Sequence, residues 1–113
     1  MRIAYVCADG GIAVFGEKGA SVHINAMADA FCRTGHELRV LCAKRGTGAA
    51  GYEVEQVSAD CGPPGTRAEK ERNHLATAAA IEDRLIRLHR IWPFDLIYER
   101  YSLWSTAGVR AAR

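Results

Sequence analysis

Apolar residues in the 113-residue chain occur in two patterns, short continuous runs and stripes at helical spacing. The runs predict parallel strands, because a parallel strand is covered on both faces, and the stripes predict amphipathic helices. Four strands are expected, over Arg2–Ala8, Glu37–Ala43, Tyr52–Val57 and Asp95–Glu99, of which the first is a near-continuous run and the third is partly alternating.

Three helices are expected between and after these strands. The first has Ser21 as its N-cap, because a serine hydroxyl can accept a first-turn amide, and Gly35 just past its end. Its apolar face consists of Ile24, Met27, Ala28 and Phe31. The second helix runs from about Arg67 to Arg90, with an apolar stripe of Leu75, Ala78, Ile81, Leu85 and Leu88. The third begins near Ser102 and continues to Arg113.

Strands that alternate with helices predict an α/β fold, a Rossmann-like parallel sheet with helices on both faces. Residues 1–113 are enough for one small domain. Ligands of such sheets bind beyond the carboxyl ends of the strands. The polar residues expected at those ends are a glycine-rich loop after the first strand, Arg45 after the second, and Glu99, Arg100 and Tyr101 after the fourth.

The glycine-rich loop between Asp9 and Gly19 leads directly into the first helix and predicts a phosphate-binding site. Bare backbone N–H groups and the positive end of a helix meet at such a point, where they bind anions. We expect the site at Gly16, Lys18, Gly19, Ala20 and Ser21, with Lys18 adding a full charge. The structural alternative is a capped helix behind a solvated loop.

Two common nucleotide-binding motifs are excluded by spacing. The loop glycines do not form G-x-G-x-x-G, and Ala43-Lys44-Arg45 stands where a dinucleotide site would place an acidic residue. Gly11 and Gly16 have the separation of a Walker A loop, but Glu17-Lys18 follows in place of Lys-Ser or Lys-Thr.

Further candidate residues lie beside this loop and at the fourth strand. His23, in the first helical turn, is expected near the ligand together with Arg45 and Tyr101. Adjacent residues of a strand point to opposite faces, so either Glu99 or Arg100 can enter a cleft. Glu99 would suit a general acid or base and Arg100 a charge clamp, the alternative being a surface pair.

Composition and charge mainly exclude classes of function. A formal net charge of +2 gives no reason to expect nucleic acid, and Arg84, Arg87 and Arg90 are expected on one solvated helix face. The four cysteines, Cys7, Cys32, Cys42 and Cys61, have no metal-site spacing, so no metal is expected. No targeting or membrane-spanning segment is visible, which favours a cytoplasmic protein and leaves peripheral membrane association open.

Three segments together resemble the N-terminal domain of the family 4 glycosyltransferases. The first is Met1–Val6 with Val14–His23 (VFGEKGASVH). The second, Thr34–Leu38 (TGHEL), is similar to a helix-to-strand turn of that family, and the third, Pro93–Leu103 (PFDLIYERYSL), is similar to the segment P-D-x-I-Y-E-R-Y-S-L of one branch. The three occur in the family's order and cover nearly the whole chain.

The resemblance implies the incomplete N-terminal half of a GT-B fold, in which two Rossmann-like domains face a cleft. Such enzymes transfer a sugar with retention from a nucleotide-sugar donor to an acceptor, without an essential metal. The nucleotide sugar is a substrate, so no cofactor is expected. The glycine loop would approach the donor phosphates, while a C-terminal donor domain, expected to be absent from these 113 residues, would hold most of the nucleotide sugar.

One position departs from the family pattern. Many members carry a catalytic-site histidine after the fourth strand, and aligning that pattern with Asp95–Arg100 places Arg100 there. A guanidinium cannot act as a base at neutral pH but stabilises phosphate or developing negative charge. The rest of the N-terminal domain and the donor domain are expected to lie outside these 113 residues, so the 113 residues alone are expected not to transfer sugar. The competing hypotheses are a non-catalytic α/β module that binds a phosphorylated ligand or a partner protein, and a small nucleotide-dependent oxidoreductase domain.

Overall fold

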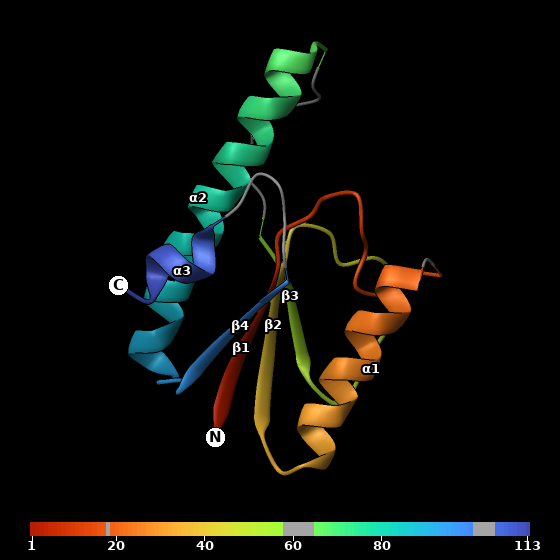
Figure 1. Ribbon diagram of the computed structural model, residues 1–113, viewed down its shortest axis with the longest axis vertical. Helices are drawn as coiled ribbons and strands as arrows, with labels where there is room; N and C mark the ends of the chain where they lie inside the picture. Colours follow the sequence, from red (N-terminus) through yellow and green to blue (C-terminus); the bar gives the residue numbers. More distant parts are fainter. Residues whose placement is uncertain (18, 58–64, 101–105) are drawn as a thin grey trace.

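The computed structural model describes residues 1–17, 19–57, 65–100 and 106–113. The elements along the chain are β1 (Arg2–Cys7), α1 (Gly19–Arg33), β2 (Glu37–Cys42), β3 (Glu53–Gln56), α2 (Arg67–Ile91), β4 (Leu96–Arg100) and α3 (Ala107–Ala111) (Figure 1). The strands were expected at these places, with ends that differ by about a residue. The expected start of the third helix, near Ser102, lies outside the described residues, and α3 is seen from Ala107 onward.

The described strands form one sheet in the order β3-β2-β1-β4, and every pairing is parallel. In the register of the sheet, Cys7 at the end of β1 lies beside Cys42 of β2 and Arg100 of β4. The carboxyl ends of three strands therefore finish side by side. The predicted α/β fold with a parallel sheet is confirmed, and this arrangement is consistent with the expected Rossmann-like type.

Helices cover both faces of this sheet, as expected (Figure 1). Strand alternation divides the sheet's apolar residues between two clusters. The cluster under α1 consists of Ile3, Tyr5, Cys7, Val14, Ile24, Ala28, Leu38, Val40 and Cys42. The cluster under α2 and α3 consists of Ala4, Val6, Ala8, Leu41, Ile81, Leu85, Leu88 and Ala107.

The connection from β2 to β3 contains no helix and instead joins the glycine loop. The Val14 N–H donates to the Lys44 carbonyl at 3.1 Å, and the Phe15 N–H donates to the Arg45 carbonyl at 2.9 Å. Gly46 has φ +74°, and a Cβ there would lie 2.2 Å from the Phe15 carbonyl oxygen. Only glycine fits this position, so the two loops are locked together at the carboxyl edge of the sheet.

The two ends of α1 differ in how well they were predicted. At its C-terminus Gly35 has φ +89°, and the N–H groups of Gly35 and His36 donate to the Cys32 and Phe31 carbonyls, a Schellman motif. At its N-terminus the expectation that Ser21 is the N-cap is wrong. The helix begins at Gly19, so Ser21 lies inside the first turn, and its hydroxyl donates to the Ala13 carbonyl.

The expected stripe along α2 holds only for the C-terminal half of the helix. Its buried residues are Ile81, Leu85 and Leu88, whereas Leu75 is 55% exposed, which corrects the expectation for Leu75. Figure 1 shows the reason, because the N-terminal half of α2 extends beyond the sheet. A capping box between Thr66 and Glu69 stabilises this projecting end. No helix in the described ranges is both long and apolar enough to cross a membrane.

Candidate functional site

The glycine loop is fixed to α1 by two side chains on the helix. Ser21, 1% exposed, bonds the Ala13 carbonyl. One turn later, the Asn25 Nδ2 donates to the carbonyls of Val14 at 2.7 Å and Ser21 at 2.9 Å. Two successive loop carbonyls, those of Ala13 and Val14, are thus held by the helix, so this part of the loop is preorganised.

The residues expected to bind phosphate can act mainly through their backbone. Gly16 and Gly19 are exposed and Ala20 is half-buried, so their N–H groups lie near solvent. The Ser21 hydroxyl is turned inward, which leaves its first-turn N–H as its possible contribution to an anion site. Lys18 lies outside the described residues. Gly16 also packs closely, since a Cβ there would lie 2.9 Å from the Ser21 Oγ.

Arg45 is half-buried and directs its donors into its own loop. Its guanidinium lies 5.0 Å from the centre of the Phe15 ring. The Nη2 donates to the Gly48 carbonyl at 3.0 Å, and the backbone N–H donates to the Gln56 Oε1 at 3.0 Å. The structure therefore places Arg45 beside the glycine loop, where its side chain bonds its own loop and packs on the Phe15 ring.

Glu99 and Arg100 lie on opposite faces of the sheet, as strand alternation predicts. The Glu99 carboxylate accepts the Gly108 N–H at 2.7 Å, so it caps the first turn of α3 on the α2 side. Arg100 lies on the α1 side, close enough to Tyr5 and Cys7 that its charge opposes the rise in their pKa values. Of the two, Arg100 alone shares the face of the sheet that carries the glycine loop.

Two further predicted cleft residues are His23 and Tyr101. His23 is exposed on α1, whereas Ser21, Ile24 and Ala28 form the buried face of that helix. Tyr101 lies outside the described residues.

Two buried thiols and a buried tyrosine hydroxyl under α1 stay protonated at neutral pH. Burial raises the pKa of Cys7 to about 12 and that of Cys42 to about 11, so neither thiol is a nucleophile. Burial also raises the pKa of Tyr5, whose hydroxyl has no hydrogen-bond partner within the described structure. In the described ranges, no three His, Cys, Asp or Glu side chains come together as metal ligands.

Sequence reasoning missed Asn25 and Tyr52. The Tyr52 hydroxyl donates to the Asn25 Oδ1 at 2.8 Å, so the start of β3 is connected to the glycine loop through one amide. A signal was present, because Ser21 and Asn25 are polar residues four apart on the helical face that also carries Ile24 and Ala28.

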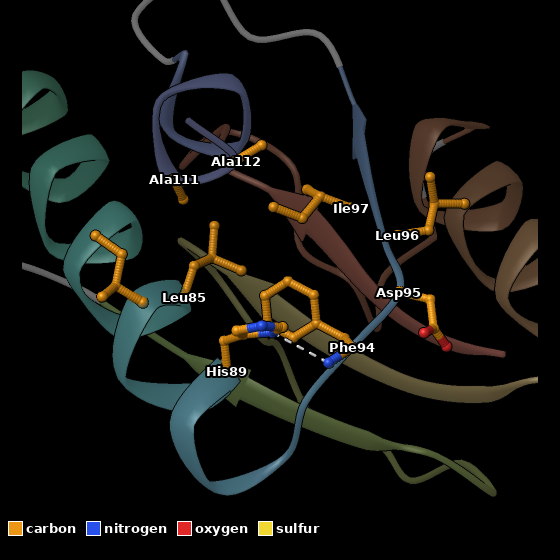
Figure 2. Close-up of a pocket in the computed structure, with 9 residues that line it drawn as sticks. Leu85, His89, Phe94, Asp95, Leu96, Ile97, Ala111 and Ala112 are labelled. Atoms are coloured by element: carbon orange, nitrogen blue, oxygen red, sulfur yellow. Dashed lines mark hydrogen bonds between the residues drawn. The ribbon is translucent and has the colours of Figure 1, made fainter.

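A cavity of about 370 Å³ lies on the opposite face of the sheet, between α2, α3 and β4. Figure 2 shows its apolar lining, including Leu85, Leu96 and Ile97, together with the His89 ring against Phe94. The His89 Nδ1 accepts the Phe94 N–H at 3.2 Å. None of the predicted site residues that the structure describes lines this cavity.

Comparisons with protein-family models, with curated proteins and with solved structures found no match to this chain.

Proposed function

We propose that the chain is the N-terminal, acceptor-side domain of a retaining glycosyltransferase of the GT-B type, which uses a nucleotide-sugar donor. The observation that carries this proposal is the arrangement of groups at the carboxyl edge of the sheet, on the face that α1 covers. There the fixed glycine loop, the N-terminus of α1 and Arg100 follow neighbouring strand ends, since Arg100 pairs with Cys7 just before the loop. Such an edge suits the diphosphate of a nucleotide sugar.

In this proposal the residues divide into two roles. Backbone N–H groups at Gly16, Gly19, Ala20 and Ser21, with the Lys18 ammonium, bind the donor phosphates. Arg100 stabilises the negative charge that develops on the leaving diphosphate, a task that needs no bound metal. His23, Arg45 and Tyr101 remain candidates for the acceptor side. A second domain supplies most donor contacts, so the 113 residues alone transfer no sugar.

A non-catalytic module that binds a phosphorylated ligand is the second candidate, and one observation favours it. Glu99, the carboxylate expected to act as an acid or base, is bound to the Gly108 N–H on the far face of the sheet. An anion site without a general base would bind a phosphorylated ligand without turning it over.

The anion site is tested by titrating the ¹⁵N-labelled chain with pyrophosphate, UDP, GDP and ADP while amide shifts are recorded. Saturable shifts are expected at Gly16, Gly19 and Ala20. Arg100→Gln should weaken binding about tenfold, since a charge-assisted contact is lost. Arg87→Gln is the matched control, because Arg87 pairs with Asp83 on α2 and should leave affinity unchanged.

Two results would contradict the anion site. One is the absence of saturable shifts at the glycine loop with any of these probes. The other is equal loss of affinity in the Arg100 and Arg87 variants, which would indicate only a change in overall charge.

A further inference from the structure

The two edges of the described sheet differ in how well they are protected from a further strand. The edge strands are β3 and β4. On β3, Glu53 forms an ion pair with Arg39 at 3.4 Å. Two residues on, Glu55 forms one with Arg84 of α2 at 2.6 Å. Charged side chains on a short edge strand hinder pairing with another chain, so the β3 edge is protected.

The β4 edge lacks this protection along most of its length. Its first three residues, Leu96, Ile97 and Tyr98, are apolar or aromatic, and Leu96 is 43% exposed. Backbone N–H and C=O groups alternate between the two sides of a strand, so some of those in β4 point away from β1. No strand of the described residues pairs with that side of β4. Such an edge is a template for an additional strand.

The apolar cavity between α2, α3 and β4 lies beside the same edge (Figure 2). Leu96 and Ile97 line it from the strand, and Ile86, 42% exposed, lines it from α2. Apolar side chains brought by an additional strand can pack against this lining and leave water as they do so. Pairing at the β4 edge therefore gains apolar burial as well as backbone hydrogen bonds.

The charges at the two ends of β4 indicate which strand fits the edge. Asp95 is exposed just before the strand, and Arg100 ends the strand without a hydrogen bond or ion pair to the described residues. In an antiparallel pair of identical strands, the Asp95 end of each lies beside the Arg100 end of the other, so opposite charges meet twice. A parallel pair in register would instead place like charges side by side.

We propose that the chain forms a two-fold dimer in which the β4 edges of two copies pair antiparallel and join the two sheets into one. Each copy offers the same surface to the other, which is the commonest form of closed protein assembly. The partner is thus a second copy of this chain. The dimer does not depend on the proposed function.

The test is the mass of the 113-residue chain in phosphate-free buffer, measured by sedimentation over roughly a hundredfold range of concentration. The mass should rise from one chain to two as the concentration increases. Hydrogen exchange should slow at least about tenfold over that range at the β4 amides that point away from β1. Exchange in β3, at the protected edge, should not change.

Leu96→Lys is the informative variant, because lysine on an edge strand opposes pairing and Leu96 is already partly exposed. It should weaken the dimer at least about tenfold. Asp95→Lys brings like charges together at both ends of the pair and should also weaken the dimer about tenfold. Leu75→Lys is the matched control, since Leu75 is 55% exposed on the projecting half of α2, and it should leave the dimer unchanged.

Three results would overturn the proposal. The chain could stay monomeric over the whole range, a dimer could form without slower exchange in β4, or the Leu96 and Leu75 variants could behave alike. Pyrophosphate shifts at Gly16 and Gly19 are recorded separately on the monomeric Leu96→Lys variant. The dimer and the anion site can therefore fail independently.

Discussion

The two faces of the sheet are built in different ways. Under α1 the apolar cluster is joined by polar contacts, in which Ser21 and Asn25 hold the glycine loop and Tyr52 joins them. Under α2 the apolar contact is confined to the C-terminal half of the helix, beside a cavity, and an Arg84–Glu55 ion pair joins the helix to β3. Both faces bury side chains, but the α1 face also fixes the position of a loop. A site that needs defined backbone geometry is therefore expected on the α1 face.

Truncating one buried side chain under α1 and one under α2 should show the largest difference between the two faces. Ile24 and Leu85 are both 0% exposed, but Leu85 adjoins the cavity by α3 and Ile24 lies in a closed cluster. Ile24→Ala should cost about 4 kcal/mol and Leu85→Ala about 2–3 kcal/mol, since cost falls where neighbours can collapse. Urea denaturation measures both.

Leu75→Ala is the matched control for these two substitutions. Leu75 lies on the projecting half of α2, so its truncation should change the unfolding free energy by less than about 0.5 kcal/mol. A larger cost for Leu85 than for Ile24, or a Leu75 effect near either, would contradict the difference between the faces.

Removal of the Asn25 side chain should have a smaller but more local effect. Asn25→Ala leaves the Val14 carbonyl of the loop, the Ser21 carbonyl of α1 and the Tyr52 hydroxyl without this partner, at a cost of about 2 kcal/mol. Amide exchange at Val14 and Phe15 should accelerate more than exchange in β1. Tyr52→Phe removes one of the three bonds and should cost about 1 kcal/mol. Unchanged exchange at the loop in Asn25→Ala would show that backbone pairing with residues 44–46 suffices.

The smallest predicted effect is the loss of stability at alkaline pH that comes from single titratable groups under α1. Burial raises the pKa of Cys42 from 9.0 to about 11 and that of Tyr52 from 10.0 to about 12. The unfolded chain therefore releases these protons first, so their contribution is fully present below about pH 9 and is lost as pH rises to about 12. Urea midpoints should fall over that range, and Cys42→Ala should flatten the decline. An unchanged decline would show that Cys42 contributes nothing to it.

The spacing of apolar residues and the glycine at a helix end predicted most of the fold. Short apolar segments predicted the four strands, of which β1 is a near-continuous buried run, and Gly35 marked the end of α1 because its left-handed conformation favours glycine. The expected burial of Leu75 was wrong because periodicity shows which face of a helix is apolar, not whether the sheet extends beneath it. Whether the Ser21 hydroxyl caps the helix or bonds a loop carbonyl depends on where the loop carbonyls lie, and tertiary structure sets that position.

The site was predicted less completely than the fold. Sequence spacing placed Glu99 and Arg100 on opposite faces, which the structure confirms through the Glu99 contact with Gly108 and the placement of Arg100 near Cys7. It could not show that Arg45 would bond within its own loop, or that Tyr52 would meet Asn25. Both depend on the path of the β2–β3 connection, which sequence spacing does not show; the Tyr52–Asn25 bond joins residues 27 positions apart.

The most direct test of the proposed glycosyltransferase role is made on the native product of the chain's own locus. Its intact mass is measured, and transfer is assayed from labelled nucleotide sugars to neutral glycoside acceptors. The account predicts a longer product with a second α/β domain that transfers sugar with retention, while the 113 residues alone transfer none. A native product that ends at Arg113, binds a phosphorylated ligand and transfers no sugar would contradict the account and establish a binding module.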